Sequence, residues 1–269
     1  MKENLQAHMN PGGHEPFWDG YRELLERLGD DAFPSPAALN ALLPPGVCSG
    51  SGKPLVFRPA AEIPAVDYEK HIYETGQVST RHESWHDLFN ALAWCRFPAL
   101  KAAMNQCHHN ELPADGSKTR SRLRDALTLL DESGAIVVSP HAELLQCLAK
   151  RDWQAAFVDQ RELWRQSQVL VCGHALLEKF PAPYKSITAH VLLVEGREGM
   201  ATAAMDQYLA ARLLQGQLFT DPTGLSPLPL MGIPGWWPGG SQDEAFYADT
   251  QVFRAPRRPF VPPSLHPAS

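Results

Sequence analysis

The chain has 269 residues, of which 44% are hydrophobic and 20% are charged, as in ordinary globular proteins, and this length suits one large domain or two small ones. Its formal net charge of −6 argues against general affinity for nucleic acid or for acidic membrane surfaces. No apolar run approaches the roughly 18 residues that a membrane-spanning helix needs, so we expect no membrane partner.

The N-terminal third of the chain predicts short helices around one extended segment. Residues 1–16 are polar and rich in Gly and Pro, and we expect them to form a flexible tail. Helices are predicted at 17–28 and 36–43, and LVFRP at 55–59 is typical of extended chain. There is no signal-peptide core and no C-x-x-C pair among the five scattered cysteines, so a cytoplasmic location is the default.

The stretch HESWH, at 82–86, matches the H-E-x-x-H pattern of zinc peptidases. However, Thr80 and Glu83 also have the spacing of a capping box, which closes the first turn of a helix. In that alternative His82 lies in a frayed turn, where a rigid pair of metal-binding histidines is not possible. We therefore predict a helix over 80–96 and no zinc-peptidase site.

This predicted helix has one apolar side and one unusual polar side. The polar side carries His86, Asp87, Asn90 and Trp94, with a single charge, whereas solvent-facing helix surfaces normally carry several long charged side chains. We therefore expect another part of the protein to cover this side. Two interpretations stay open, namely hydrogen bonds to a neighbouring loop or a ligand- or metal-binding surface.

The middle of the chain predicts alternating helices and strands. A helix should run from Pro98 to about residue 108. LTLLDESGAIVV, at 127–138, has two apolar runs around turn-forming residues, so we predict a β-hairpin there. Asp131 and Glu132 could supply metal ligands, but the turn accounts for Asp131 without a metal.

The C-terminal half predicts an α+β fold with a wrapping coil. Helices are expected at 140–150, 152–166, 174–180 and 199–215, and strands at 169–172 and 187–195. The last fifty residues have almost no periodicity, so we expect a coil that wraps the domain, anchored by Trp236 and Trp237. The prediction is thus a single mixed α+β domain at 17–258, with helices packed on a small sheet, and a disordered tail at 259–269.

Three further sets of residues have both a functional and a structural interpretation. His174 and Glu178 are four residues apart after a predicted strand, which suits a ligand site or a surface ion pair. His190 lies in an apolar strand, where a buried, hydrogen-bonded histidine is the alternative to a ligand. The basic run from Lys118 to Arg124 could bind phosphate or form a solvated surface.

Several longer motifs resemble one protein family. WHDLFNALAW, RDALTLLDESG, GHALLE, TAH, GIPGWWP and FYADTQVFR, spread over 18–258, are together similar to a bacterial family catalogued as a domain of unknown function, number 3025. The resemblance implies a single-domain bacterial protein and little chemistry. The family motif begins at Trp85, so the resemblance gives no support to His82 and Glu83 as site residues. The motifs include His86, Asp87, Asn90, Lys101, Asn105, Arg124, Asp125, Asp131, Glu132, His174, Glu178, His190, Asp249 and Arg254.

The sequence favours a metal-dependent or acid/base hydrolase that acts on a small anionic molecule, for example one that bears a phosphate. Its alternative is a non-catalytic binding module with a polar pocket for a small ligand or a partner peptide. The predicted catalytic residues are His86, Asp87, His174 and Glu178. The predicted ligands of a divalent metal (Zn, Mn or Mg) are His86, Asp87, His174 and His190. The predicted anion-binding residues are Asn90, Lys101, Asn105, Arg124 and Arg254.

Overall fold

The computed structural model describes residues 15–29, 33–64, 67–112, 120–197, 199–255 and 266–267. The predicted N-terminal tail, apart from its last two residues, lies outside the described residues, and so does Lys118. The same holds for the predicted C-terminal tail, apart from 266–267. Within the described part of the chain, no helix has the length and apolar character needed to cross a membrane.

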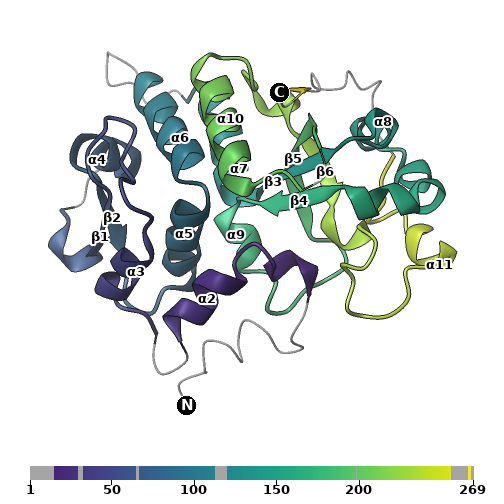
Figure 1. Cartoon of the computed structure of the whole chain (residues 1–269), viewed down its shortest axis with the longest axis horizontal. Helices are drawn as coiled ribbons and strands as arrows, with labels where there is room; N and C mark the ends of the chain where they lie inside the picture. The colour runs from purple at the N-terminus through teal and green to yellow at the C-terminus, as the bar shows by residue number, and fades with distance from the viewer. Residues whose placement is uncertain are drawn as a thin grey trace.

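The fold is α+β, with helices packed around a small mixed sheet (Figure 1). The strand order in this sheet is β4-β3-β5-β6, and a short β7 also pairs with β5. Strand β3 is parallel to β5 and antiparallel to β4, and all six of its residues are buried. The strands are β3 (Gly134–Ser139), β4 (Gln168–Val171), β5 (Thr188–Glu195), β6 (Ser226–Pro229) and β7 (His266–Pro267).

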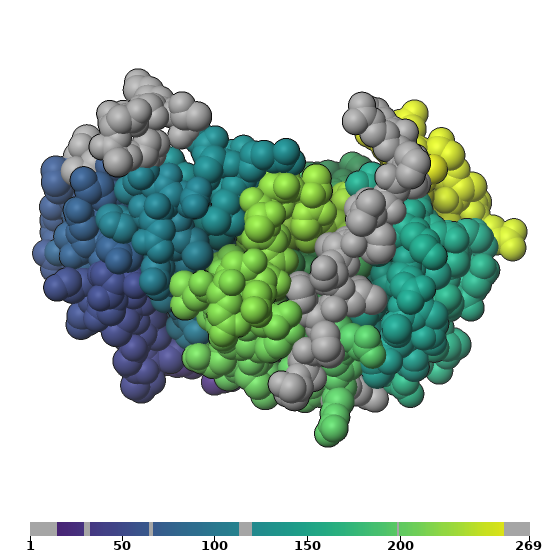
Figure 2. Space-filling model, turned by 90° about the horizontal axis from the view of Figure 1, so that it is seen from above, coloured from purple at the N-terminus to yellow at the C-terminus, as the bar shows by residue number. Residues whose placement is uncertain are grey.

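A second, two-stranded parallel sheet lies at the other end of the molecule, and two central helices separate it from the first sheet (Figure 1). It consists of β1 (Val56–Pro59) and β2 (Gln77–Thr80). The central helices are α5 (Trp85–Arg96) and α6 (Pro98–Asn110). Helix α10 packs along α6, and Figure 2 shows its green segment beside the blue and teal N-terminal half. Buried apolar residues from both ends of the molecule form one hydrophobic core.

Most of the predicted elements are confirmed, including the helix that begins at Pro98 and the buried strand β5. Two elements before residue 85, α4 and β2, were not predicted. The predicted helix at 152–166 consists of a π-helical turn and a 3-10 helix. The remaining helices are α2 (Arg22–Leu28), α3 (Pro36–Leu42), α4 (Tyr68–Thr75), α7 (Arg122–Ser133), α8 (Ala142–Lys150), α9 (His174–Leu177), α10 (Thr202–Leu214) and α11 (Glu244–Tyr247).

The C-terminal segment wraps the domain, as predicted, but it is not only coil. Its strand β6 pairs with β5, and it also contains the short helix α11. Trp236 is buried, and its ring packs 6.0 Å from that of Phe17 near the N-terminal end of the described chain. This aromatic contact therefore joins the C-terminal segment to the N-terminal end of the described chain.

The predicted β-hairpin at 127–138 is wrong, because helix α7 occupies its first half and continues directly into β3. Ala126, Leu127 and Leu130 recur at helical spacing and are completely buried, so they form the apolar side of a helix. The Ser121 hydroxyl accepts a hydrogen bond from the Arg124 amide and caps the helix. As a result, the residues that resembled a turn form the last turn of α7.

Two glycines allow the end of α7 to lie against the start of α9. A Cβ atom on Gly173 would lie 2.3 Å from the Gly134 amide nitrogen and 2.8 Å from the Glu132 carbonyl oxygen, which no larger residue tolerates. The amides of Cys172 and Gly173 both donate hydrogen bonds to the Gly134 carbonyl. This close crossing places His174, the first residue of α9, beside the carboxylates at the end of α7.

The predicted capping box at Thr80 is also wrong. Thr80 belongs to β2, and the side chain that caps α5 is Ser84, whose hydroxyl accepts a hydrogen bond from the Asp87 amide. Glu83 has a left-handed backbone (φ 51°), which separates strand from helix. His82 and Glu83 are therefore exposed and lie before the helix, so the H-E-x-x-H spelling does not place its two histidines on one helix face.

Candidate functional site

A cavity of about 400 Å³ lies among α4, the end of β2, α5, α6, α7 and α9, and we call it the polar cavity. The polar side of α5 faces this cavity, and the surrounding elements lie over that side, as the sequence predicted. Every side chain that lines it carries polar atoms. The lining residues are Tyr68, Glu69, Ser79, Arg81, His86, Asp87, Asn90, His108, Arg120, Arg124, Thr128, Asp131, Glu132 and His174.

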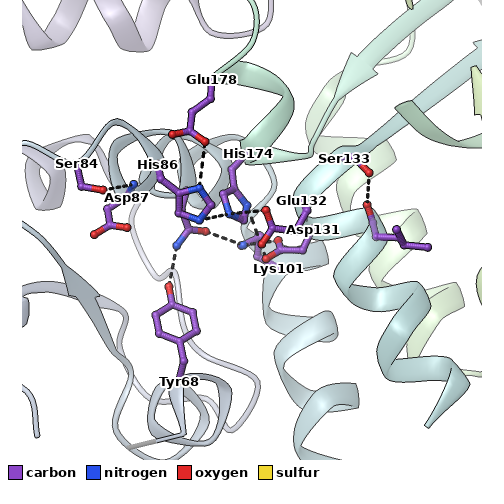
Figure 3. A network of polar contacts seen from close by, with 12 residues as sticks. Tyr68, Ser84, His86, Asp87, Lys101, Asp131, Glu132, Ser133, His174 and Glu178 are labelled. Carbon is purple, nitrogen blue, oxygen red and sulfur yellow. Dashed lines mark hydrogen bonds and ion pairs between the residues drawn. The ribbon is translucent and has the colours of Figure 1, made fainter. Parts of the chain in front are cut away.

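Two histidines and a carboxylate converge at one side of the polar cavity (Figure 3). The Nε2 atoms of His86 and His174 lie 3.0 Å apart, and Nε2 of His174 lies 3.6 Å from Oε2 of Glu132. One ligand atom from each of the three residues lies within 4.8 Å of the other two. A tetrahedral ion about 2.1 Å from each ligand atom would separate the ligand atoms by about 3.4 Å, so the three residues have the spacing of a metal site.

Each of the two histidines has a carboxylate near its second ring nitrogen, but only that of His86 lies within hydrogen-bond distance. Nδ1 of His86 lies 3.2 Å from Oε2 of Glu178, and Nδ1 of His174 lies 3.8 Å from Oδ2 of Asp131. Metal-binding histidines usually pair their other ring nitrogen with a carboxylate or carbonyl, which sets the tautomer and the ring orientation. The two histidines thus share one arrangement, with Nε2 toward a common point and Nδ1 toward a carboxylate.

The three possible ligands differ in their access to solvent. The side chain of His174 is 5% exposed, whereas those of His86 and Glu132 are 36% and 43% exposed. An ion among them would therefore be open toward the polar cavity. Catalytic zinc sites keep one such position for water or substrate, whereas structural sites are closed by four protein ligands.

A chain of hydrogen bonds leads from Asp131 through Lys101 and Asn90 to Tyr68 (Figure 3). The Lys101 ammonium, which is 7% exposed, forms an ion pair with Asp131 and donates to Oδ1 of Asn90 at 2.8 Å. Nδ2 of Asn90 then donates to the Tyr68 hydroxyl at 2.8 Å. Lys101 is also 5.3 Å from the centroid of the Trp94 ring. Lys101 and Asn90 are therefore committed to partners inside the protein.

The charges of the group follow from burial and from these pairs. Burial lowers the pKa of His174 to about 4, with Asp131 opposing the shift and Lys101 adding to it, so the imidazole is neutral at pH 7. Burial raises the pKa of Glu132, and the charge of Asp131 raises it further. Burial alone would raise the pKa of Asp131, but the Lys101 ammonium, together with His174 and His108, outweighs it and keeps that pKa below its usual range.

The structure brings only part of the predicted metal set together. His86 and His174 lie in the group, whereas Asp87 and His190 do not. Asp87 accepts hydrogen bonds from the Arg81 amide (2.7 Å), Nε (2.9 Å) and guanidinium NH2 (2.6 Å), so both of its carboxylate oxygens are occupied. Nδ1 of His190 lies 2.8 Å from the Ser133 hydroxyl, which is the hydrogen-bonded alternative considered for it.

The predicted anion-binding residues are also divided. Arg124 lines the polar cavity, whereas Arg254 is not among the lining residues and donates from Nε to the Gln251 carbonyl. Asn105 cross-links α6 to its surroundings, since it donates to Glu69 and accepts from the Gly50 amide. Its side chain therefore has a structural partner on each side.

Sequence reasoning named Glu132 as a possible metal ligand but did not group it with the two histidines, because a turn was predicted in this part of the chain. A signal was present: Arg124, Thr128 and Glu132 are spaced by four residues, which puts polar side chains on one helix face beside the apolar one. Tyr68 and Arg81 gave no such signal. They reach the cavity from α4 and from the end of β2, two elements that were not predicted.

The profile of one protein family, described as Protein of unknown function (DUF3025), matches residues 55–257. This range includes every residue that lines the polar cavity. No curated protein and no solved structure matches the chain.

Proposed function

The chain belongs to the DUF3025 family, and we propose that it is a metal-dependent hydrolase of a small anionic substrate such as a phosphate ester. His86, His174 and Glu132 would bind the ion. Glu178 and Asp131 would orient the two histidines. A cytoplasmic location and a bacterial source stay predictions from the sequence.

One observation carries this proposal: both histidines direct Nε2 to a shared point beside Glu132, and each has a carboxylate near Nδ1, at 3.2 Å for His86 and at 3.8 Å for His174. The carboxylates come from different elements, α7 and the end of α9, so the repeated arrangement does not follow from a local sequence motif. Two imidazoles and one carboxylate suit Zn or Mn better than Mg, which prefers oxygen ligands alone.

The arginines of the polar cavity support an anionic substrate. Arg81 is paired with Asp87, and Arg120 with Asp125. Arg124 lines the same cavity, and among the described residues no carboxylate lies within ion-pair distance of its guanidinium. A guanidinium that faces a cavity without a carboxylate partner is a suitable partner for a phosphate or carboxylate group of a ligand.

Hydrolysis of a phosphate ester needs groups that this cavity would supply. The oxygen of a water molecule bonds to phosphorus, the bond to the leaving-group oxygen breaks, and that oxygen receives one of the water protons. A divalent ion with an open position lowers the pKa of bound water toward 7 and polarises the phosphoryl oxygen. The chain itself would hold the ion by three residues and the substrate anion by Arg124.

The test is metal analysis of purified protein after Zn or Mn loading, followed by an assay on 4-nitrophenyl phosphate. We expect about one ion per chain in the wild type, and loss of the ion in His86→Ala and His174→Ala. His190→Ala, a histidine outside the group, is the matched control and should keep the ion. Equal metal content in His86→Ala and the wild type would remove the metal centre from the proposal.

The binding-module alternative has a distinct outcome in the same experiment. A module without catalysis would bind inorganic phosphate through Arg124 but would hydrolyse no ester, with or without the ion. Loss of phosphate binding in Arg124→Gln, together with no turnover by the metal-loaded wild type, would favour that alternative over the hydrolase.

A further inference from the structure

We infer that Tyr68 is a further catalytic residue of the proposed hydrolase, donating a hydrogen bond from its hydroxyl to the substrate oxygen that becomes negative during hydrolysis. This inference rests on the metal-dependent function proposed above. It assigns a role to a residue that no sequence motif indicated. Its basis is the direction in which each hydrogen bond of the Lys101–Asn90–Tyr68 chain must run (Figure 3).

The first step is the orientation of Asn90. A lysine ammonium has three donors and no acceptor, so the Asn90 atom 2.8 Å from Nζ of Lys101 must be the carbonyl oxygen Oδ1. The ion pair of Lys101 with Asp131 keeps the ammonium charged and in place. The amide of Asn90 therefore has one permitted orientation, with its NH2 group directed to Tyr68.

The second step is the orientation of the Tyr68 hydroxyl. Nδ2 of Asn90 lies 2.8 Å from that hydroxyl and can only donate, so the hydroxyl oxygen accepts this bond. The hydroxyl proton must then point elsewhere, and no described residue accepts a hydrogen bond from it. Since Tyr68 lines the polar cavity, this proton is available to a ligand there.

The third step is the position of the hydroxyl relative to the ion. Asn90 follows His86 by four residues on α5, so the two side chains are neighbours on the same helix face, with Cβ atoms about 5–6 Å apart. The hydroxyl of Tyr68 is one hydrogen bond from Asn90, and Tyr68 and His86 line the same cavity. A substrate bound between them would meet the ion on one side and the hydroxyl on the other.

The chemical role is electrostatic. As water attacks phosphorus and the bond to the leaving group breaks, negative charge grows on the substrate oxygens, and a fixed donor stabilises it without reorganising. The proton stays on Tyr68 throughout, so no acceptor or further reactant is needed. Tyr68 is 42% exposed as a whole, but desolvation at its hydroxyl raises its pKa and the charge of Glu69 adds to the effect, so the donor is protonated at neutral pH.

The experiment compares wild type, Tyr68→Phe and the control Tyr184→Phe, all loaded with Zn. Tyr184 is 47% exposed and lies outside the polar cavity. We expect equal metal content in all three proteins. With 4-nitrophenyl phosphate as substrate, kcat should fall about 10²- to 10³-fold in Tyr68→Phe, as it does when a single donor to a developing oxyanion is removed. The dissociation constant for inorganic phosphate, measured by calorimetry, should rise about tenfold or more.

A second variant tests the direction of the chain itself. In Asn90→Asp the new carboxylate can still accept from Lys101, but its second oxygen accepts as well, so the Tyr68 hydroxyl turns to donate to it. Asn90→Asp should therefore lose phosphate affinity and kcat as Tyr68→Phe does, although the tyrosine is present. The double variant should lose little more than either single one, because both remove the same donor.

The outcomes separate this inference from the proposed function. A wild type that binds neither Zn nor Mn overturns the metal centre, and this inference with it. Normal metal content with unchanged kcat and phosphate affinity in Tyr68→Phe overturns this inference alone. A wild type that binds metal but does not hydrolyse the ester overturns the catalytic role of Tyr68, and a weaker phosphate affinity in Tyr68→Phe would then assign the hydroxyl to ligand binding alone. Losses that multiply in the double variant would contradict the proposed direction of the chain.

Discussion

Two cavities of similar size border α5, one along its N-terminal half and one at its C-terminal end, and they differ in what lines them. The polar cavity has a volume of about 400 Å³ and contains the His86, His174 and Glu132 group. The second, of about 360 Å³, lies along β4, and we call it the aromatic cavity because Phe17, Trp164 and Trp236 line it. Volume therefore does not distinguish them, whereas convergent titratable groups do.

The two cavities also balance their charges differently. In the aromatic cavity the cation Arg96 donates to the neutral hydroxyl of Thr202 at 2.6 Å. Beneath the polar cavity the buried cation Lys101 is opposed by the carboxylate of Asp131, which lines the cavity and lies near His174. Lys101 at the polar cavity thus belongs to a network of charged and polar groups, whereas Arg96 in the aromatic cavity has, among the described residues, a single hydrogen bond to a neutral partner. Changes in the polar cavity should therefore have the larger consequences.

The largest expected effect is on stability. Lys101→Met leaves Asp131 buried without its cation, and loss of one partner of a buried ion pair costs about 3–5 kcal/mol. The matched change in the aromatic cavity, Arg96→Met, removes a bond from a guanidinium to a neutral hydroxyl and should cost less, about 1.5–3 kcal/mol. Urea unfolding of both metal-free variants measures the difference. Similar losses would show that the two cavities do not differ in this respect.

The next effect concerns the ion. Glu132→Gln removes a charged ligand, and we expect Zn affinity to fall by about 100-fold or more, beyond the 10- to 100-fold typical of residues outside the ligand set. Glu143→Gln, an exposed change that leaves the polar cavity intact, serves as the control. Competition with a chromogenic chelator gives both affinities. An unchanged affinity in Glu132→Gln would exclude this residue as a ligand.

A smaller loss of Zn affinity is expected for Glu178, which contacts a proposed ligand but is not one itself. Glu178→Gln keeps the shape of the side chain but removes the charge that faces Nδ1 of His86. Zn affinity should fall by about 10-fold, at the lower end of the range for such partners, because Glu178 is 37% exposed and partly screened by water. A loss equal to that of Glu132→Gln would mean that Glu178 is itself a ligand.

The last expected effect is the pH dependence of stability that comes from His108. Burial lowers the pKa of His108 to about 4, with Asp131 opposing the shift. This pKa lies below that of a histidine in the unfolded chain. The contribution of neutral His108 to the stability of the folded state is therefore complete above pH ~6.5 and is lost as the pH falls toward 4. From pH 7 to pH 5 the wild type should lose about 2 kcal/mol more than His108→Gln.

This difference is measured by urea unfolding with a chelator present, so that release of a metal does not contribute. His82→Gln, a change at an exposed histidine outside both cavities, should behave as the wild type does. An identical pH dependence in His108→Gln would show that His108 is not buried in its neutral form.

Local sequence patterns predicted much of the fold, because local physics determines those elements. Pro98 begins a helix since its ring suits a first turn, and the apolar run of β5 forms a strand buried in the sheet. The pattern failed at 127–138, where turn-forming residues lie at the end of a helix. There, burial of Leu127 and Leu130 against the core outweighs the local turn preference of Asp131 and its neighbours.

The polar side of α5 was recognisable from sequence, and so were His86, His174 and Glu178 as candidates. The sequence alone thus determined which residue types were available and that one helix side needed a cover. Only the tertiary structure decided that Glu132, rather than Asp87 or His190, completes the group. The physical reason is that the close contact of Gly173 with the start of β3 joins α9 to the end of α7, and contacts between distant segments leave no local pattern.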